Sequence, residues 1–165
     1  MLFEPRAADM DPVDLESALL RTAVGDYTAE AAILLLANAG YWLPALATAD
    51  LIAVRFNEDP TAPPAGEVLG VGWAAIAWTD LDAALHAGRI EGSSGQWRIL
   101  RAAASIADGQ PVDLGDVASG LDRRHLQLLL AAISHAGGSH EHRPLSPHGF
   151  RHRPLPPLLA WPPRD

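Results

Sequence analysis

The sequence predicts a mainly α, small α+β domain of about six helices, with a short antiparallel β-hairpin and a disordered, proline-rich C-terminal tail. Several segments begin at a helix-capping residue and end at a glycine. Two short stretches, 51–56 and 71–78, contain β-branched and aromatic residues. Residues 139–165 hold seven prolines and no periodic apolar face. We therefore expect one domain over 12–138 and a flexible tail rich in Pro, Arg and His over 139–165.

The clearest helix is predicted between Asp122 and Gly137. Asp122 can cap the first turn by accepting a backbone N–H, and Gly137 is a natural helix stop. Four large apolar residues recur at the i, i+3, i+4, i+7 spacing of one helical face; they are Leu126, Leu129, Leu130 and Ile133. We expect these four side chains to lie at the centre of a single core.

The sequence predicts three further helices in the N-terminal part of the chain. The first opens at Pro12 with Asp14 as its cap, and the second is capped by Thr28 and ends at Gly40. The third has Pro44 in its first turn and runs to about residue 50. Residues 51–56 could extend that helix or form a short strand.

The sequence predicts the hairpin in the middle of the chain. Residues 57–66 have the composition of a loop, and the best strand candidate lies within 68–78. We expect 51–56 and 71–78 to pair as two antiparallel strands that lie on the helices, because an isolated two-stranded ribbon is not stable. Thr79 is then the expected cap of a helix that ends at Gly88.

Two more helices are expected before Asp122. Ser93 or Ser94 begins one that ends at Gly109, and a short helix follows over about 111–119. The segments over 94–137 should pack together as one unit.

Composition limits the possible classes of protein. The chain has 165 residues, 48% hydrophobic, which is enough for one ordinary domain with a core. The net charge of −8 argues against general affinity for nucleic acid. All 12 basic residues are Arg, which is typical of a GC-rich bacterial coding bias, and the absence of Cys excludes disulfides and thiolate metal sites.

Targeting signals are not evident. The first residues are acidic and lack the basic and apolar regions of a secretory signal. The longest apolar segments are far below the roughly 20 residues that a membrane span needs. We therefore expect a cytoplasmic protein without membrane contact.

Charge is distributed unevenly. Residues 1–60 hold ten acidic residues and three Arg, whereas residues 123–165 hold two acidic residues and six Arg. Such a split indicates a C-terminal segment with its own behaviour.

A histidine cluster offers a candidate metal site. His140 and His142 could present two imidazoles to a divalent ion, with His135 or Glu141 nearby as a third ligand. A flexible His-rich segment without a metal is the more frequent situation, since a site also needs fixed outer partners. We expect no cofactor.

A nucleic-acid site is the second candidate. The pair of helices over 113–137 has the outline of a helix-turn-helix, with Arg123, Arg124 and Gln127 at the start of its second helix. Nearby acidic residues would repel phosphates, so net charge disfavours DNA as a partner.

The tail offers a third candidate. Arg151, Pro154 and Pro157 match a polyproline II recognition pattern, in which an extended segment docks in an aromatic groove of a partner protein. The pattern is short and frequent by chance in such a tail.

Motifs of catalysis do not appear: there is no phosphate-binding glycine loop, nucleophile elbow or zinc-protease helix. The sequence therefore favours a non-catalytic protein-interaction or adaptor module with an unidentified protein partner. A small DNA-binding regulator that uses the helix pair at 113–137 is the alternative.

Overall fold

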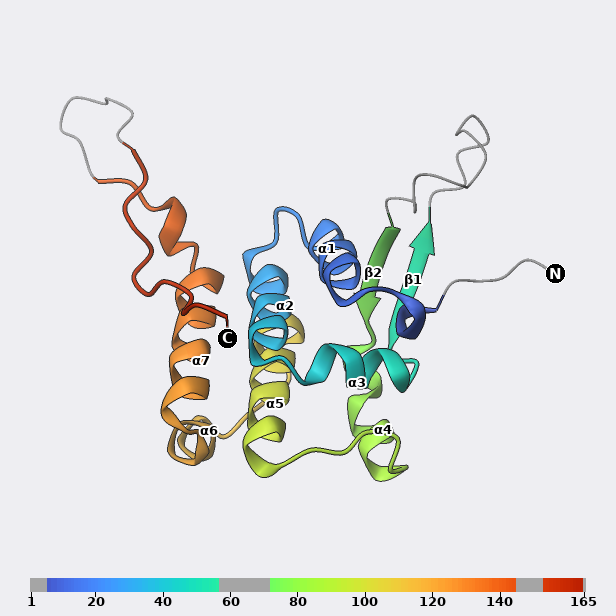
Figure 1. Cartoon of the computed structure of the whole chain (residues 1–165). Helices are drawn as coiled ribbons and strands as arrows, with labels where there is room; N and C mark the ends of the chain where they lie inside the picture. Colours follow the sequence, from blue (N-terminus) through green and yellow to red (C-terminus); the bar gives the residue numbers. More distant parts are fainter. Residues whose placement is uncertain (1–5, 57–71, 145–152, 165) are drawn as a thin grey trace, which may run out of the picture. The chain divides into compact units, whose positions relative to one another are not determined.

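The computed structural model describes residues 6–56, 72–144 and 153–164 (Figure 1). The mainly α prediction with a small antiparallel hairpin is confirmed. The described residues form seven α-helices, two strands and three 3-10 turns. The helices are α1 (Pro12–Thr22), α2 (Tyr27–Ala39), α3 (Trp42–Thr48), α4 (Leu81–His86), α5 (Ser94–Asp108), α6 (Leu114–Gly120) and α7 (Arg123–Ala136), and the strands are β1 (Ile52–Phe56) and β2 (Gly72–Ile76).

The chain divides into two compact units that alternate along the sequence. Unit 1 comprises Met1–Val24 and Tyr41–Glu91, and unit 2 comprises Gly25–Gly40 and Gly92–Asp165. The single domain expected over 12–138 stays a prediction.

Unit 1 is built around the hairpin. β1 and β2 are antiparallel, with Ile52 opposite Ile76 and Phe56 opposite Gly72. α1 packs beside β2 (Figure 1), and the Arg21 guanidinium donates to the Gly72 carbonyl at 2.7 Å. The ribbon thus lies on a helix, as its marginal stability in isolation requires.

The structure decides between helix and strand for the segment that follows α3. Asp50 has a left-handed φ of 55°, which ends the helical path and turns the chain into β1. The Leu51 N–H donates back to Leu46, while the Leu51 carbonyl accepts from Ala77. Residues 52–56 are therefore a strand.

Unit 2 is a helical unit with α2 at its centre. α2 packs against both α5 and α7 (Figure 1). Its buried face combines small and large residues, namely Ala31, Ala32, Ile33, Leu35 and Leu36. Gly40 ends α2 in the left-handed conformation, as expected.

Three of the predicted helix caps are wrong, and α6 begins at Leu114 rather than at about residue 111. Asp11, not Asp14, caps α1, and Asp26, not Thr28, caps α2. In both helices the acceptor lies just before the first turn, while Asp14 and Thr28 lie inside it. A 3-10 turn over Trp78–Asp80 replaces the predicted cap of α4 at Thr79.

The other two caps that the sequence indicates are present. Ser93 and Gln96 form a reciprocal capping box at the start of α5. Asp122 accepts the His125 N–H at 2.8 Å at the start of α7.

The predicted core stripe of α7 is wrong in part. Leu129 is buried, but Leu130 and Ile133 are 42% and 48% exposed, and Leu126 is half-buried. The buried face is formed instead by Leu128, Leu129, Ala131, Ala132 and Ser134. α2 and α7 pack together and both bury alanines, and small side chains allow two helices to approach closely.

Parts of the predicted disordered tail hold defined positions. Residues 139–141 form a 3-10 turn, and residues 153–164 follow an extended path in unit 2. Residues 145–152 lie outside the described residues.

Over the described ranges, no single helix is long and apolar enough to cross a membrane. Helices α2 and α3, taken together as one bent pair, have the required length and composition, and only these two properties support a span.

Candidate interaction site

Unit 2 holds its C-terminal segment with buried polar side chains. Within the described residues, three polar side chains are buried: Asn38, Ser134 and Ser139, which are 9%, 7% and 3% exposed. Each of the three makes a hydrogen bond to residues 158–164. The polar groups of this core are therefore all directed at one extended stretch of chain, which we call the C-terminal segment (residues 153–164).

A pair of serines binds the main chain of this segment. The two hydroxyls of Ser134 and Ser139 lie 2.7 Å apart. The Leu158 N–H donates to Ser139 Oγ at 3.2 Å, and the Leu159 N–H donates to Ser134 Oγ at 3.0 Å. Buried polar groups are stable only when they are paired, so the serines and the two amides satisfy one another.

The ends of the segment are fixed as well. Arg164 Nε donates to Asn38 Oδ1 on α2 at 3.1 Å, and Asn38 in turn donates to the Leu34 carbonyl. The Leu155 N–H donates to the His142 carbonyl at 2.7 Å. The segment therefore contacts α2, the end of α7 and the turn that follows it.

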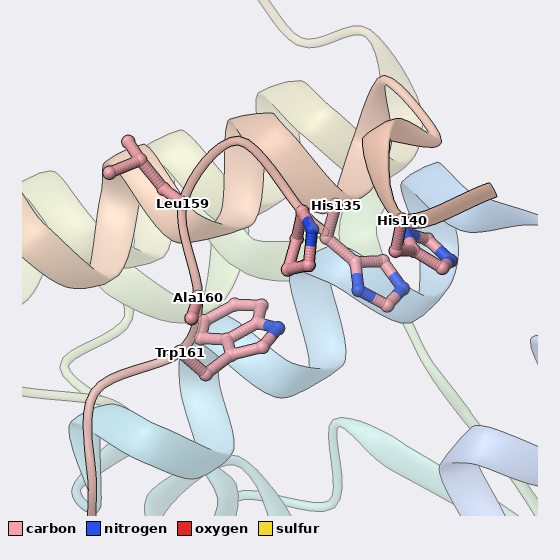
Figure 2. A pocket seen from close by; sticks show the side chains of 6 residues that line it. His135, His140, Leu159, Ala160 and Trp161 are labelled. Atoms are coloured by element: carbon pink, nitrogen blue, oxygen red, sulfur yellow. The ribbon is translucent and has the colours of Figure 1, made fainter. Parts of the chain in front are cut away.

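An aromatic cluster lies beside the segment. Figure 2 shows His135 projecting from α7 between Trp161 and His140. The His135 and His140 rings stack with centroids 4.4 Å apart, Trp161 lies 6.2 Å from His135, and Tyr27 meets both imidazoles edge-on. Glu30 of α2 fixes the ring of His135, because its carboxylate lies 3.0 Å from His135 Nε2.

A shallow cavity of about 380 Å³ opens between the cluster and the segment. Its lining is almost entirely apolar and consists of His135, His140, Pro157, Leu159, Ala160 and Trp161 (Figure 2). In the same view the Leu159 side chain points away from the two imidazole rings.

Large apolar side chains remain exposed around the C-terminal half of α7. Leu130 and Ile133 are 42% and 48% exposed, and Leu158 and Leu159 are 79% and 45% exposed. Ser134, which holds Leu159, follows Ile133 directly and lies one turn after Leu130. We call these four residues the apolar surface of unit 2.

The predicted metal ligands come together only in part. His135 and His140 stack, but within the described ranges no group of three or more His, Asp or Glu side chains could hold a metal ion. The geometry therefore gives no support to a site formed by His135, His140 and His142.

The predicted nucleic-acid residues lie at the start of α7. Arg123 and Gln127 are exposed one turn apart, and Arg124 is half-buried. Hydrogen bonds from Arg98 lower the pKa of Asp116, and those from the His125 backbone and side chain lower the pKa of Asp122. Both carboxylates stay charged at neutral pH, and Asp122 directly precedes the two arginines, which opposes phosphate binding.

The predicted polyproline pattern is described only in part. Arg151 lies outside the described residues, Pro154 is exposed, and Pro157 is exposed at the rim of the cavity. The structure shows the segment that carries Pro154 and Pro157 bound to its own chain.

Sequence reasoning missed the residues that hold the segment. Ser134 and Ser139 flank the end of α7, and neither carries a recognisable motif. The one available signal was the apolar run of Leu158, Leu159 and Trp161 within a proline-rich stretch.

Comparison of the chain with protein-family models, with curated proteins and with solved structures found no match.

Proposed function

We propose that this chain is a non-catalytic protein-interaction module that acts in the cytoplasm through the apolar surface of unit 2. One observation carries the proposal: Leu130 and Ile133 on α7, and Leu158 and Leu159 on the segment that Ser134 of α7 binds, are each at least 42% exposed. Contiguous exposed apolar surface is typical of sites that bind other proteins.

The charge of the two units supports the same choice of surface. Unit 2 contains eight acidic residues and eight Arg, so its formal charge is zero, whereas unit 1 contains twelve acidic residues and four Arg. The whole net charge of −8 therefore resides in unit 1. Unit 2 itself therefore contributes no net charge to the encounter with a partner, and net charge chiefly steers association.

Capture from lysate with matched variants tests the proposal. The double substitution Leu130→Glu and Ile133→Glu should abolish capture of a specific protein, because it places charge in the apolar surface. Val13→Glu is the matched control, since Val13 is an apolar residue of unit 1 that is 69% exposed. Capture that is equal in all three proteins, or absent in the unmodified chain, would contradict the proposal.

DNA binding is the second candidate, and the exposed pair of Arg123 and Gln127 favours it. The first residues of a recognition helix contact base edges in such proteins. A salt-dependent mobility shift with duplex DNA, lost on Arg123→Ala with Arg124→Ala, would support this function. A chain that causes no shift at low salt excludes it.

A further inference from the structure

The surface beneath the C-terminal segment has the properties of a peptide-binding site. We infer that Asn38, Ser134, His135 and Ser139 form a docking site for an extended peptide of a partner protein, which residues 155–164 occupy in cis. The inference goes beyond the apolar surface, because it assigns the side chains that bind the segment bearing Leu158 and Leu159, and peptide binding measures that site directly.

The main evidence is the placement of buried polarity. The three buried polar side chains of the described chain all face this one segment. A helix pair that needed only a core would place apolar residues there, since a buried polar group destabilises a fold unless it is hydrogen-bonded. These side chains instead suit a ligand that brings its own hydrogen bonds.

The two serines recognise the main chain of the peptide rather than its side chains. Ser134 and Ser139 accept two consecutive N–H groups, at a bend over residues 158–159. The Leu158 side chain is 79% exposed, so the site makes little use of it. The partner therefore needs two successive residues other than proline at these positions, because proline lacks the N–H.

Side-chain selection comes from two further positions. Trp161 lies against His135, two residues after the second serine-bound amide, and Arg164 reaches Asn38 three residues later. An aromatic ring beside an imidazole and a guanidinium hydrogen-bonded to an amide are both directional contacts. The fitting partner is thus an extended peptide with an aromatic residue followed, three positions on, by arginine.

The segment of the chain itself competes for this site. Covalent attachment gives a cis ligand an effective concentration of about millimolar for short flexible connections. A partner peptide must displace it, so weakening the cis segment should raise affinity for a peptide supplied in trans. The cis contact therefore lowers the affinity of the site for a peptide of a partner protein.

The test uses the full chain and a fluorescein-labelled peptide of residues 153–164, with binding followed by anisotropy. Trp161→Ala removes the aromatic contact between the cis segment and His135, so the cis segment competes less well with the added peptide. The peptide should therefore bind this variant about tenfold more tightly than it binds the unmodified chain. Leu155→Ala in the chain is the matched control, because this side chain lies in the same segment, is 45% exposed and is not part of the apolar surface.

A change in the probe avoids any effect on folding of the protein. A peptide N-methylated at Leu159 lacks the N–H that Ser134 accepts. It should bind the Trp161→Ala chain at least about tenfold more weakly than the unmethylated peptide, because the buried Ser134 Oγ loses this donor and keeps only its contact with Ser139. A peptide with Leu155→Ala should bind as the unmodified peptide does, because this side chain is 45% exposed. Equal binding of the N-methylated and unmethylated peptides, or no binding of either, would overturn the inference.

Discussion

Helices α5 and α7 both pack on α2, but they differ in how many of their large apolar side chains are buried. α5 buries Ile99 and Leu100 almost completely, and none of its large apolar side chains is strongly exposed. α7 buries Leu128 and Leu129 but leaves Leu130 and Ile133 nearly half exposed. Two helices of similar length on the same support thus differ in how much apolar surface remains for another contact.

The reason lies in the number of apolar residues on each helix. α7 carries two apolar stripes on nearly opposite sides, one through Leu128 and Ala132 and one through Leu126, Leu130 and Ile133. α2 can cover only one of them. The surplus stripe on α7, beside the docked C-terminal segment, is the surface that an additional partner could cover.

Core truncation should show the largest effect and separates the two faces of α7. Leu128 is fully buried, so Leu128→Ala should lower the free energy of unfolding by about 2–5 kcal/mol, as Leu→Ala does in packed cores. Leu130→Ala should change it by only about 0.5 kcal/mol, as is usual for exposed positions. Urea denaturation followed by circular dichroism measures both values.

Leu100→Ala on α5 serves as the reference, because Leu100 is as deeply buried as Leu128. It should destabilise by a similar amount. If Leu130→Ala were as damaging as Leu128→Ala, the exposed stripe of α7 would be part of the core and the contrast with α5 would fail.

The sequence predicted the existence of α7 but not its orientation. Spacing identifies both stripes as helical faces, and it favours the one with larger side chains at 126, 129, 130 and 133. The choice between them depends on the partner helix: Ala31 and Ala32 of α2 are fully buried, and a close approach of α2 is possible where α7 also presents alanines. This information lies about one hundred residues away in the chain.

The candidate site was harder to predict than the fold. Caps such as Asp122 and Ser93 follow local rules, because their acceptor and donor lie within three residues. The contacts that hold Leu158, Leu159 and Arg164 join residues 19 to 126 positions apart, and no local pattern encodes them. Proline content and the lack of a periodic apolar face predicted a disordered or extended tail, and local pattern could not identify the hydrogen bonds that hold Leu158, Leu159 and Arg164.

The caps provide a second, smaller comparison of the two helices. Ser93→Ala and Asp122→Ala each remove a side-chain acceptor from the first turn, and each should lower the free energy of unfolding by about 1 kcal/mol. Urea denaturation at neutral pH checks both. A loss below about 0.3 kcal/mol in either variant would mean that water replaces that cap without cost.

Acid should weaken the Asp122 cap but not the Ser93 cap. This effect on stability should be smaller than the effects of core truncation and of cap removal. Hydrogen bonds from the His125 backbone and side chain lower the pKa of Asp122, whereas the hydroxyl of Ser93 does not titrate. A carboxylate whose pKa is lower in the folded than in the unfolded chain stabilises the fold fully above its ordinary value of about 3.9. That contribution disappears as the pH falls through the lowered pKa, so acid should loosen the start of α7 and leave the start of α5 intact.

The backbone amides report this difference directly. The His125 N–H donates to Asp122 Oδ1 at 2.8 Å, and the Gln96 N–H donates to Ser93 Oγ at 3.2 Å. Between pH 5 and about 2, the amide proton shift of His125 should titrate with a midpoint below about 3.9, while that of Gln96 stays constant. Asp122→Asn is the control, since it keeps an acceptor that carries no charge and should remove the titration. A midpoint at or above the ordinary aspartate value would mean that the carboxylate gains nothing from capping α7, and that the two helix starts are electrostatically alike.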